Sequence, residues 1–282
     1  MTRYVVTGAG GMLGHDLLDA LTGREVTALT RADLDITDPA AVRAALRGAD
    51  VVINAAAYTR VDDAESDEAS AFAINATGAG ILADAAAAVG ARLVHVSTDY
   101  VFDGSGTEPY AEDTPRRPLG AYGRTKAAGE ELVLRHPEVY VVRTAWLYGE
   151  HGGNFPTTML RLARERESLS VVTDQVGQPT WSRDLADAIV RLLDTDAPFG
   201  IYHGTNSGTA SWFDLARAVF ELAGLDPERI QPTDSSAFTR PAPRPAYSVL
   251  GHEAWRAAGL TPPRDWHAAL TDAYTRGALS AA

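Results

Sequence analysis

The chain has 282 residues, a formal net charge of −12 and no cysteine; 45% of its residues are hydrophobic and 22% are charged. This is a globular composition, and the negative charge argues against nonspecific binding to nucleic acid or to an anionic membrane. The absence of cysteine excludes disulfides and thiol catalysis and fits a cytoplasmic protein. No apolar run approaches the length of about 18 residues that a membrane span needs, so we predict no membrane segment.

The first predicted elements are a strand over residues 3–7, a glycine turn and a helix over residues 12–21. The turn reads Thr-Gly-Ala-Gly-Gly-Met-Leu-Gly. Gly8 permits a tight turn, Gly11 lets backbone N–H groups approach a pyrophosphate, and Gly14 lets the helix pack close to the strand. Met12 and Leu13 complete the first helical turn. In this context the glycines predict dinucleotide binding, although a glycine turn that serves only strand–helix packing is the alternative.

The second predicted strand, over residues 25–29, is followed by Arg31. An arginine at this point accommodates the 2′-phosphate of NADPH, whereas an acid would favour NADH. Asp33 and Asp35 follow closely, so we predict NADPH and keep NADH open. A helix then begins near Pro39.

Further strands are predicted over residues 50–54, 92–97 and 139–144, with a long helix over residues 68–90. Alternating strands and helices predict an α/β fold with a doubly wound parallel sheet. Thr7, Asn54, Ser97 and Thr144 end their strands, so their side chains should share one cleft. Beyond residue 150 the predicted strands, 169–172 and 200–203, are short. Helices separate them and follow them, over residues 155–166, 183–193, 211–223, 253–258 and 266–274.

Tyr122 and Lys126 are four residues apart, which places them on one face of a helix. An ammonium group beside a phenol would lower the phenol pKa from about 10 toward 7, suitable for a general acid. An ordinary surface pair is the alternative, and the glycine turn in the same chain favours catalysis.

With both motifs, the sequence resembles the extended short-chain dehydrogenase/reductase family. The run Val51-Val52-Ile53-Asn54-Ala55-Ala56-Ala57-Tyr58-Thr59 is similar to that family's third strand and cofactor loop. Within the family, the chain resembles the dTDP-4-dehydrorhamnose reductases from residue 4 to about residue 274. This resemblance rests on Ser97-Thr98-Asp99-Tyr100-Val101-Phe102, Arg143-Thr144-Ala145-Trp146-Leu147-Tyr148, Asn154-Phe155 and Asp174-Gln175-Val176-Gly177-Gln178-Pro179-Thr180.

The resemblance implies a dinucleotide-binding domain over residues 1–150 and a smaller substrate lobe over residues 151–282, with some segments returning to the first domain. It implies hydride transfer to the C4 keto group of a dTDP-4-keto-6-deoxyhexose, in particular dTDP-4-dehydrorhamnose. The implied catalytic residues are Thr98, Tyr122 and Lys126. The implied cofactor contacts include Met12, Leu13, Asp35, Ile36, Ala55, Ala56, Ala57, Tyr122 and Lys126, and the Lys126 amine is expected to hydrogen-bond the nicotinamide ribose. The implied substrate contacts are Thr98, Asp99, Tyr100, Trp146, Asn154, Phe155, Gln178 and Arg244.

For three of these residues the sequence adds a physical argument. Arg244 would bind phosphate bidentately, Trp146 would lie on the sugar ring outside the core, and Asp99 would bind a sugar hydroxyl or cap a turn. The seven histidines show no metal-ligand spacing and are expected at the surface, and no metal is predicted. Some family members dimerise through magnesium; Asp16 keeps one acidic position, but Arg183 replaces another, so a monomer or an unbridged homodimer is expected.

Two alternatives remain. A nucleotide-sugar epimerase or dehydratase has the same fold, but dehydration needs an Asp-Glu pair after Thr98, where this chain has Asp99-Tyr100. Regulatory subunits of methionine adenosyltransferase share the architecture without acting as reductases, and the complete set of Thr98, Tyr122 and Lys126 argues against that role.

Overall fold

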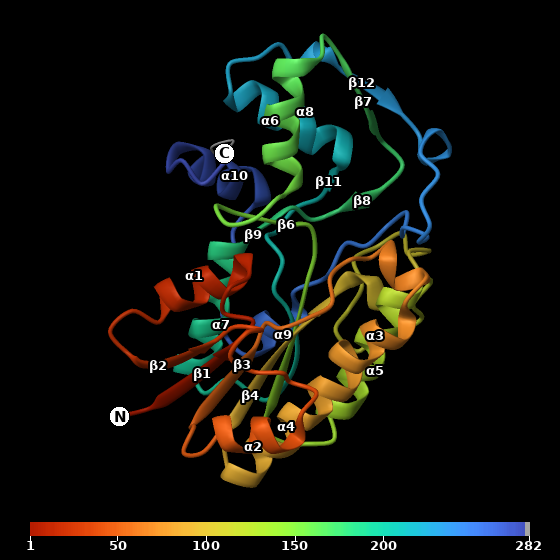
Figure 1. Cartoon of the computed structure of the whole chain (residues 1–282). Coiled ribbons are helices and arrows are strands. Elements are labelled where there is room, and N and C mark those ends of the chain that lie inside the picture. The colour runs from red at the N-terminus through yellow and green to blue at the C-terminus, as the bar shows by residue number, and fades with distance from the viewer. Residues whose placement is uncertain (280–282) are drawn as a thin grey trace.

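A computed structural model describes residues 1–279 of the chain. Its main sheet has six parallel strands in the order β10-β5-β4-β3-β1-β2 (Figure 1). The strand order changes direction between β1 and β3, and open α/β sheets bind ligands at such a point. The strands are β1 (Arg3–Thr7), β2 (Glu25–Leu29), β3 (Val51–Asn54), β4 (Arg92–Thr98), β5 (Val139–Thr144) and β10 (Gly200–His203).

Helices cover both faces of this sheet because each face presents a buried apolar surface. On one face α1, α7 and α9 contribute Leu17, Ile189 and Trp255 to a common core. On the other face α2, α4 and α5 contribute Val42, Leu82 and Val133. The helices are α1 (Met12–Ala20), α2 (Pro39–Ala45), α3 (Glu68–Phe72), α4 (Ala79–Val89), α5 (Ala121–Val133), α7 (Ser182–Asp194) and α9 (Glu253–Ala257).

The remaining elements pack around a third apolar cluster, in the upper part of Figure 1. Three two-stranded sheets, β11-β8, β12-β7 and β6-β9, accompany its helices. The helices are α6 (Phe155–Glu165), α8 (Trp212–Leu222) and α10 (Trp266–Thr275), and the strands are β6 (Leu147–Tyr148), β7 (Leu169–Val172), β8 (Val176–Gly177), β9 (Thr180–Trp181), β11 (Ala210–Ser211) and β12 (Ile230–Thr233).

The doubly wound parallel sheet is confirmed, and the predicted strands and helices are present with ends that move by one or two residues. The long predicted helix consists of α3, a π-helical segment (Ala73–Gly78) and α4 in direct succession. No run long and apolar enough to span a membrane is predicted from the sequence. Among the described residues, however, the helix Glu68–Val89 is long and apolar enough to cross one. Its side chains Leu82, Ala83 and Ala86 are buried in the core beside the sheet, because this helix covers one of the sheet's faces.

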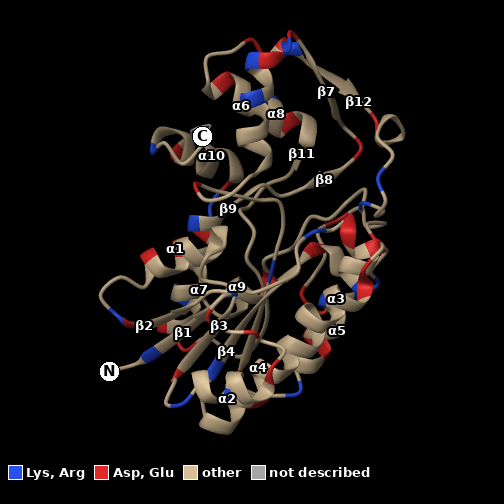
Figure 2. Ribbon diagram, viewed as in Figure 1, with Lys and Arg blue, Asp and Glu red and all other residues tan. Residues whose placement is uncertain are grey.

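Charged residues of both signs are spread along the helices and the connecting loops (Figure 2). Acidic residues gather near α3, where Asp62, Asp63, Glu65, Asp67 and Glu68 follow one another closely. Arg124 of α5 forms an ion pair with Glu68 here, at 2.7 Å. Most of this acidic segment lies in the connection between β3 and α3. Its residue Asp62 binds Arg244, one of the predicted substrate residues.

Candidate active site

The strand registers bring the predicted polar residues to one edge of the sheet. Thr7 pairs with Asn54, and Thr98 pairs with Thr144. These four residues are buried at the carboxyl ends of their strands. Strand β4 ends at Thr98, one residue beyond the predicted end at Ser97, and the Ser97 hydroxyl donates to Glu130 Oε1 at 2.6 Å instead of joining this group. The Thr7 hydroxyl donates a 2.8 Å hydrogen bond to Asn54 Oδ1, so the strand ends are joined by side chains as well as by backbone.

The glycine turn is packed too tightly for side chains. Gly8 has φ +71°, and a Cβ there would lie 2.6 Å from the Ala55 carbonyl carbon. A Cβ on Gly14 would lie 2.7 Å from the backbone of Ala9. Gly11 is the N-cap of α1, and it is followed by the uncharged turn Met12-Leu13-Gly14. The first N–H groups of α1 are therefore available to an anion, which fits the pyrophosphate of a dinucleotide.

The side chains after β2 fit a 2′-phosphate better than a 2′-hydroxyl. Arg31 is exposed, whereas the Asp33 carboxylate accepts hydrogen bonds from the backbone N–H and the hydroxyl of Thr30. Asp35 similarly binds the N–H and hydroxyl of Thr37. Both acids are thus engaged by their own loop, and the arginine remains to meet an anion. Ile36 is buried in the core, as is Leu13, so its side chain supports the fold beside the cofactor loop.

The loop of Ala55, Ala56 and Ala57 is held from both ends. Ala56 N–H donates to Asn54 Oδ1 at 3.1 Å, and Tyr58 N–H donates to Asn75 Oδ1 at 2.8 Å. The Asn75 amide nitrogen donates to the Tyr58 carbonyl and to the Thr125 hydroxyl, at 3.1 Å each. Asn75 lies in the π-helical segment, and π-bulges in helices are frequent at functional sites. It therefore connects the cofactor loop to the helix that carries Tyr122.

Helix α5 begins at Ala121 and places Tyr122 and Lys126 one turn apart, as predicted. The Tyr122 hydroxyl is hydrogen-bonded to Thr98, and the Tyr100 ring meets the Tyr122 ring edge-on at 5.5 Å. The three predicted catalytic residues are thus gathered, together with Asp99 and Tyr100, at the carboxyl end of β4. A phenol that can donate a proton, beside a second hydroxyl, is suited to protonating a carbonyl oxygen.

The prediction that Lys126 lowers the pKa of Tyr122 is wrong. Burial raises the pKa of Tyr122 instead of lowering it, and Asp99 and Tyr100 add to the increase. The Lys126 ammonium points elsewhere, because its Nζ donates a 2.6 Å hydrogen bond to the Val96 carbonyl. Burial also lowers the pKa of Lys126 to about 8. Sequence spacing gave the common helix face but not the direction of the amine.

Asp99 is buried beside the Thr98 hydroxyl. Its Oδ1 accepts a 3.0 Å hydrogen bond from the Thr98 hydroxyl, which in turn accepts from the Tyr100 N–H. Burial raises the pKa of Asp99 to about 6, although hydrogen bonds with Ser248 and Thr98 oppose the increase. The sequence predicts two roles for Asp99, a sugar contact and the cap of a turn. Thr98, and not Asp99, caps the turn after β4, so the sugar contact stays as the prediction for Asp99.

Trp146 differs in part from its prediction. Its backbone has φ +47°, and its indole stacks on Trp212 at 3.6 Å with an interplanar angle of 8°. It is half-buried and packs against the core of the carboxy-terminal elements, so it is not separate from the core as predicted. The Trp212 ring covers one face of the Trp146 indole. Phe155 packs on Trp212 as well, at 4.6 Å.

Two predicted substrate residues are engaged by the fold. Asn154 is the N-cap of α6, where it accepts from Thr157 N–H, and its amide donates to the Gly149 carbonyl at 2.8 Å. The buried Gln178 amide bonds both the carbonyl and the N–H of Leu250. Their polar atoms are bonded to backbone and, for Gln178 Oε1, also to the Thr205 hydroxyl, so these residues shape the region instead of offering free groups.

Arg244 lies at the site but is paired. Its guanidinium binds Asp62 bidentately, at 2.6 and 2.9 Å, and Asp62 also accepts from Ala242 N–H. The pair connects the proline-rich segment near the end of the chain to the loop after β3. The guanidinium that is predicted to bind phosphate is thus paired with the Asp62 carboxylate.

Sequence reasoning missed Asp62, Asn75 and Trp212, because no local pattern marks a partner that is distant in sequence. It also misplaced histidines: His95, His203 and His252 are buried, not at the surface. Asp16 likewise is buried and hydrogen-bonded to Ser182.

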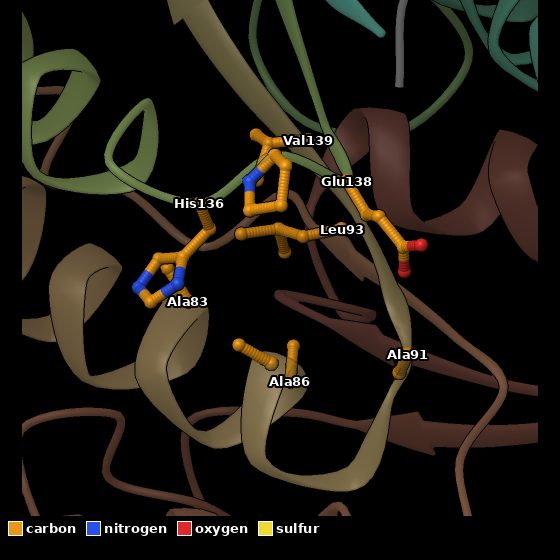
Figure 3. A pocket seen from close by; sticks show the side chains of 9 residues that line it. Ala83, Ala86, Ala91, Leu93, His136, Glu138 and Val139 are labelled. Atoms are coloured by element: carbon orange, nitrogen blue, oxygen red, sulfur yellow. The ribbon is translucent and has the colours of Figure 1, made fainter.

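A small hollow of about 240 Å³ lies away from these residues (Figure 3). It is lined mainly by alanines, with Leu93 and Val139 from the amino ends of β4 and β5, and with His136 and Glu138. Because it opens at the opposite edge of the sheet, it does not belong to the candidate site.

The sheet order and the glycine turn define a Rossmann-type α/β protein. The chain matches the family described as "RmlD substrate binding domain" over residues 2–278, and it belongs to this family. It is 53% identical to a dTDP-4-dehydrorhamnose reductase of Streptomyces griseus over 96% of this chain and 93% of that protein. It is 51% identical to a probable dTDP-4,6-dihydroxy-2-methyloxan-3-one 4-ketoreductase of Streptomyces antibioticus, over 96% and 94%. A crystal structure of dTDP-4-dehydrorhamnose reductase from Bacillus anthracis in complex with NADP superimposes with a TM-score of 0.94, at 38% identity, over 98% of this chain and 100% of that one.

Proposed function

We propose that this protein is an NADPH-dependent reductase of the C4 keto group of a dTDP-4-keto-6-deoxyhexose, in particular of dTDP-4-dehydrorhamnose. The observation that carries the proposal is the grouping of Thr98, Tyr122 and Lys126 at the sheet edge that also holds the glycine turn. The names of the relatives support a dTDP-linked keto-sugar, and the NADP-bound relative supports the cofactor.

The roles follow from the chemistry of each group. NADPH, when bound with its pyrophosphate at the amino end of α1, supplies the hydride. Thr98 and Tyr122 would hold the carbonyl oxygen between their hydroxyls, and Tyr122 would give that oxygen its proton. Because the pKa of Tyr122 is raised, the phenol holds its proton at neutral pH, although the raised pKa also makes it a weaker acid than the sequence predicted.

We further propose that residues 1–150 form the cofactor domain and that residues 151–282 form the substrate lobe, with β10 and α7 returning to the first domain. Arg244 would bind the diphosphate in a region that includes Phe155, and Trp146 and Tyr100 would border the sugar. The charge of −12 supports the prediction that the protein acts without binding nucleic acid or a membrane. Location in the cytoplasm and action as a monomer or homodimer stay predictions.

The test is single-turnover oxidation of NADPH with dTDP-4-dehydrorhamnose, followed by the nicotinamide absorbance and by identification of the sugar product. We expect stoichiometric oxidation and a dTDP-6-deoxyhexose. A second assay with dTDP-glucose tests the alternatives: release of water, or inversion of the C4 hydroxyl, without net NADPH oxidation would indicate the dehydratase or epimerase alternative. Tight NADPH binding without turnover of any dTDP-keto-sugar would indicate a regulatory subunit.

A further inference from the structure

Lys126 is the only lysine in the sequence, against 24 arginines. Arginine keeps its charge at all relevant pH values, whereas a buried lysine can lose its proton. Lys126 therefore has the only side-chain amine in the sequence. It lies on α5, the helix that also carries Tyr122, the proposed acid. The surroundings of Lys126 Nζ consequently bear on the reaction.

Lys126 is 2% exposed, and its Nζ has two close neighbours on β4. It donates to the Val96 carbonyl at 2.6 Å, and it lies 3.5 Å from His95 Nε2. The other titratable groups around it are Tyr122 and Glu130, each one turn away on α5. Glu130 is itself neutralised by Arg143 of β5 and by Arg116. His95 is thus the nearest titratable side chain to the amine from a different element.

The protonation of His95 follows from a chain of hydrogen bonds. Ala56 N–H can only donate, and it donates to Asn54 Oδ1, which fixes the orientation of that amide. Asn54 Nδ2 therefore faces His95 Nδ1, at 3.0 Å, and donates to it. Burial lowers the pKa of His95 well below its ordinary value, so the ring is neutral. A neutral ring that accepts at Nδ1 carries its hydrogen on Nε2.

We propose that His95 is a positioning residue for the reaction: held by Asn54 in the Nε2–H tautomer, it directs this N–H at the Lys126 amine and disfavours the ammonium form. A donor facing an ammonium opposes it, whereas the same donor can bond the lone pair of a neutral amine. Lys126 then exchanges its proton near neutral pH, so that the charge on the helix of the proposed acid depends on pH in the range in which the reaction would run. The link to the reaction rests on the proposed function, but the state of the amine does not.

The experiment uses the single lysine. Protein labelled with ¹³C and ¹⁵N in lysine gives one side-chain Cε and one Nζ resonance, whose dependence on pH reports Lys126 directly, without turnover. We expect a midpoint near pH 8 in the unaltered protein. In His95→Asn, which removes the N–H next to the amine, the midpoint should rise by about one unit. In His252→Asn, which alters an equally buried histidine bonded to Thr205, the midpoint should not move.

An unchanged or lower midpoint in folded His95→Asn would overturn the proposal, as would titration of Lys126 at the ordinary lysine pKa of about 10.4 in the unaltered protein. If His95→Asn does not fold, ¹⁵N spectra of the unaltered protein decide: a hydrogen on His95 Nε2 supports the proposal and a hydrogen on Nδ1 overturns it. The basic limb of the pH profile of kcat should follow the same shift. Failure of turnover alone would reject the proposed function and leave the amine titration intact.

Discussion

At the residue scale, the site holds buried hydroxyls, a carboxyl and an amine whose pKa values are displaced mainly by burial. Tyr122, Asp99 and Lys126 are each pushed toward the neutral form. Burial of ionisable groups lowers the stability of a folded protein, and proteins accept this loss mainly at sites where the groups act on a ligand. Three predictions follow from individual side chains.

Tyr122→Phe should reduce turnover by roughly 10²–10⁴ while leaving NADPH affinity nearly unchanged, because the phenol acts on the carbonyl and not on the phosphates. The measurements are single-turnover NADPH oxidation and an NADPH binding isotherm. Turnover within threefold of the unaltered protein would show that another group donates the proton.

Asp99→Asn should stabilise the protein at neutral pH but not in acid. The pKa of this carboxyl is raised from 3.8 to about 6, so the folded state loses stability as pH rises through that interval. The cost is complete above pH 6, at about 3 kcal/mol for a shift of this size, and absent below pH 4. Thermal melting at pH 7.5 should show a gain of roughly 5–10 °C, which disappears near pH 4.

The control is Asp33→Asn, for which the sign reverses. Hydrogen bonds from Thr30 lower the pKa of Asp33, so its contribution is favourable at neutral pH and is lost in acid. Opposite pH trends for the two variants are expected. The same trend in both would mean that general charge, and not the local environment, controls the melting temperature.

Arg31→Ala should weaken NADPH by about 1.5–3 kcal/mol, the scale of a hydrogen bond to a charged group, and leave NADH almost unchanged. The exposed Arg43 on α2 offers a matched substitution, Arg43→Ala, that should change neither affinity. Equal weakening of both cofactors by Arg31→Ala would assign that side chain to the structure of the loop.

At the element scale, the π-helical segment controls the cofactor loop through Asn75. Asn75→Ala removes hydrogen bonds to both backbone groups of Tyr58 and to Thr125. We expect a loss of about 1–3 kcal/mol of stability together with weaker NADPH binding, because the loop of Ala55, Ala56 and Ala57 loses its anchor. Calorimetric melting and an NADPH titration measure the two effects.

Asn206→Ala is the matched control, since Asn206 is equally buried and bonds Trp181, Asp184 and the Arg264 carbonyl. It should lower the melting temperature without changing NADPH affinity. If the two variants affect the cofactor alike, Asn75 has no special relation to the loop.

The elements themselves could largely be predicted from sequence, because alternating patterns and glycine turns are local signals. The strand ends at Thr7, Asn54 and Thr144 were predicted for the same reason. The direction of Lys126 Nζ, the pairing of Arg244 with Asp62 and the stacking of Trp146 on Trp212 could not be predicted. Each depends on a contact between residues far apart in the chain or on different elements, and no spacing encodes it.

At the scale of the whole molecule, the Arg244–Asp62 pair joins the carboxy-terminal segment to the first half of the chain. If Arg244 binds diphosphate, Asp62 competes with it. Arg244→Ala should weaken dTDP binding at least tenfold, or about 1.4 kcal/mol, and Asp62→Asn should strengthen it. Calorimetric titration with dTDP in the presence of NADP⁺ measures both, and weakening by both variants would instead make Asp62 the residue that holds Arg244 in place.

The position of β10 in the main sheet has a consequence for synthesis on the ribosome. Strand β5 ends at Thr144, but its outer neighbour begins at Gly200, so 55 residues are made between them. At roughly 5–20 residues per second this takes about 3–11 seconds. During that time a fully buried strand has one unpaired edge, which is a site for pairing between nascent chains. Ribosomes that translate one message close together would therefore carry the greatest risk of aggregation in this interval, before the sheet receives its last strand.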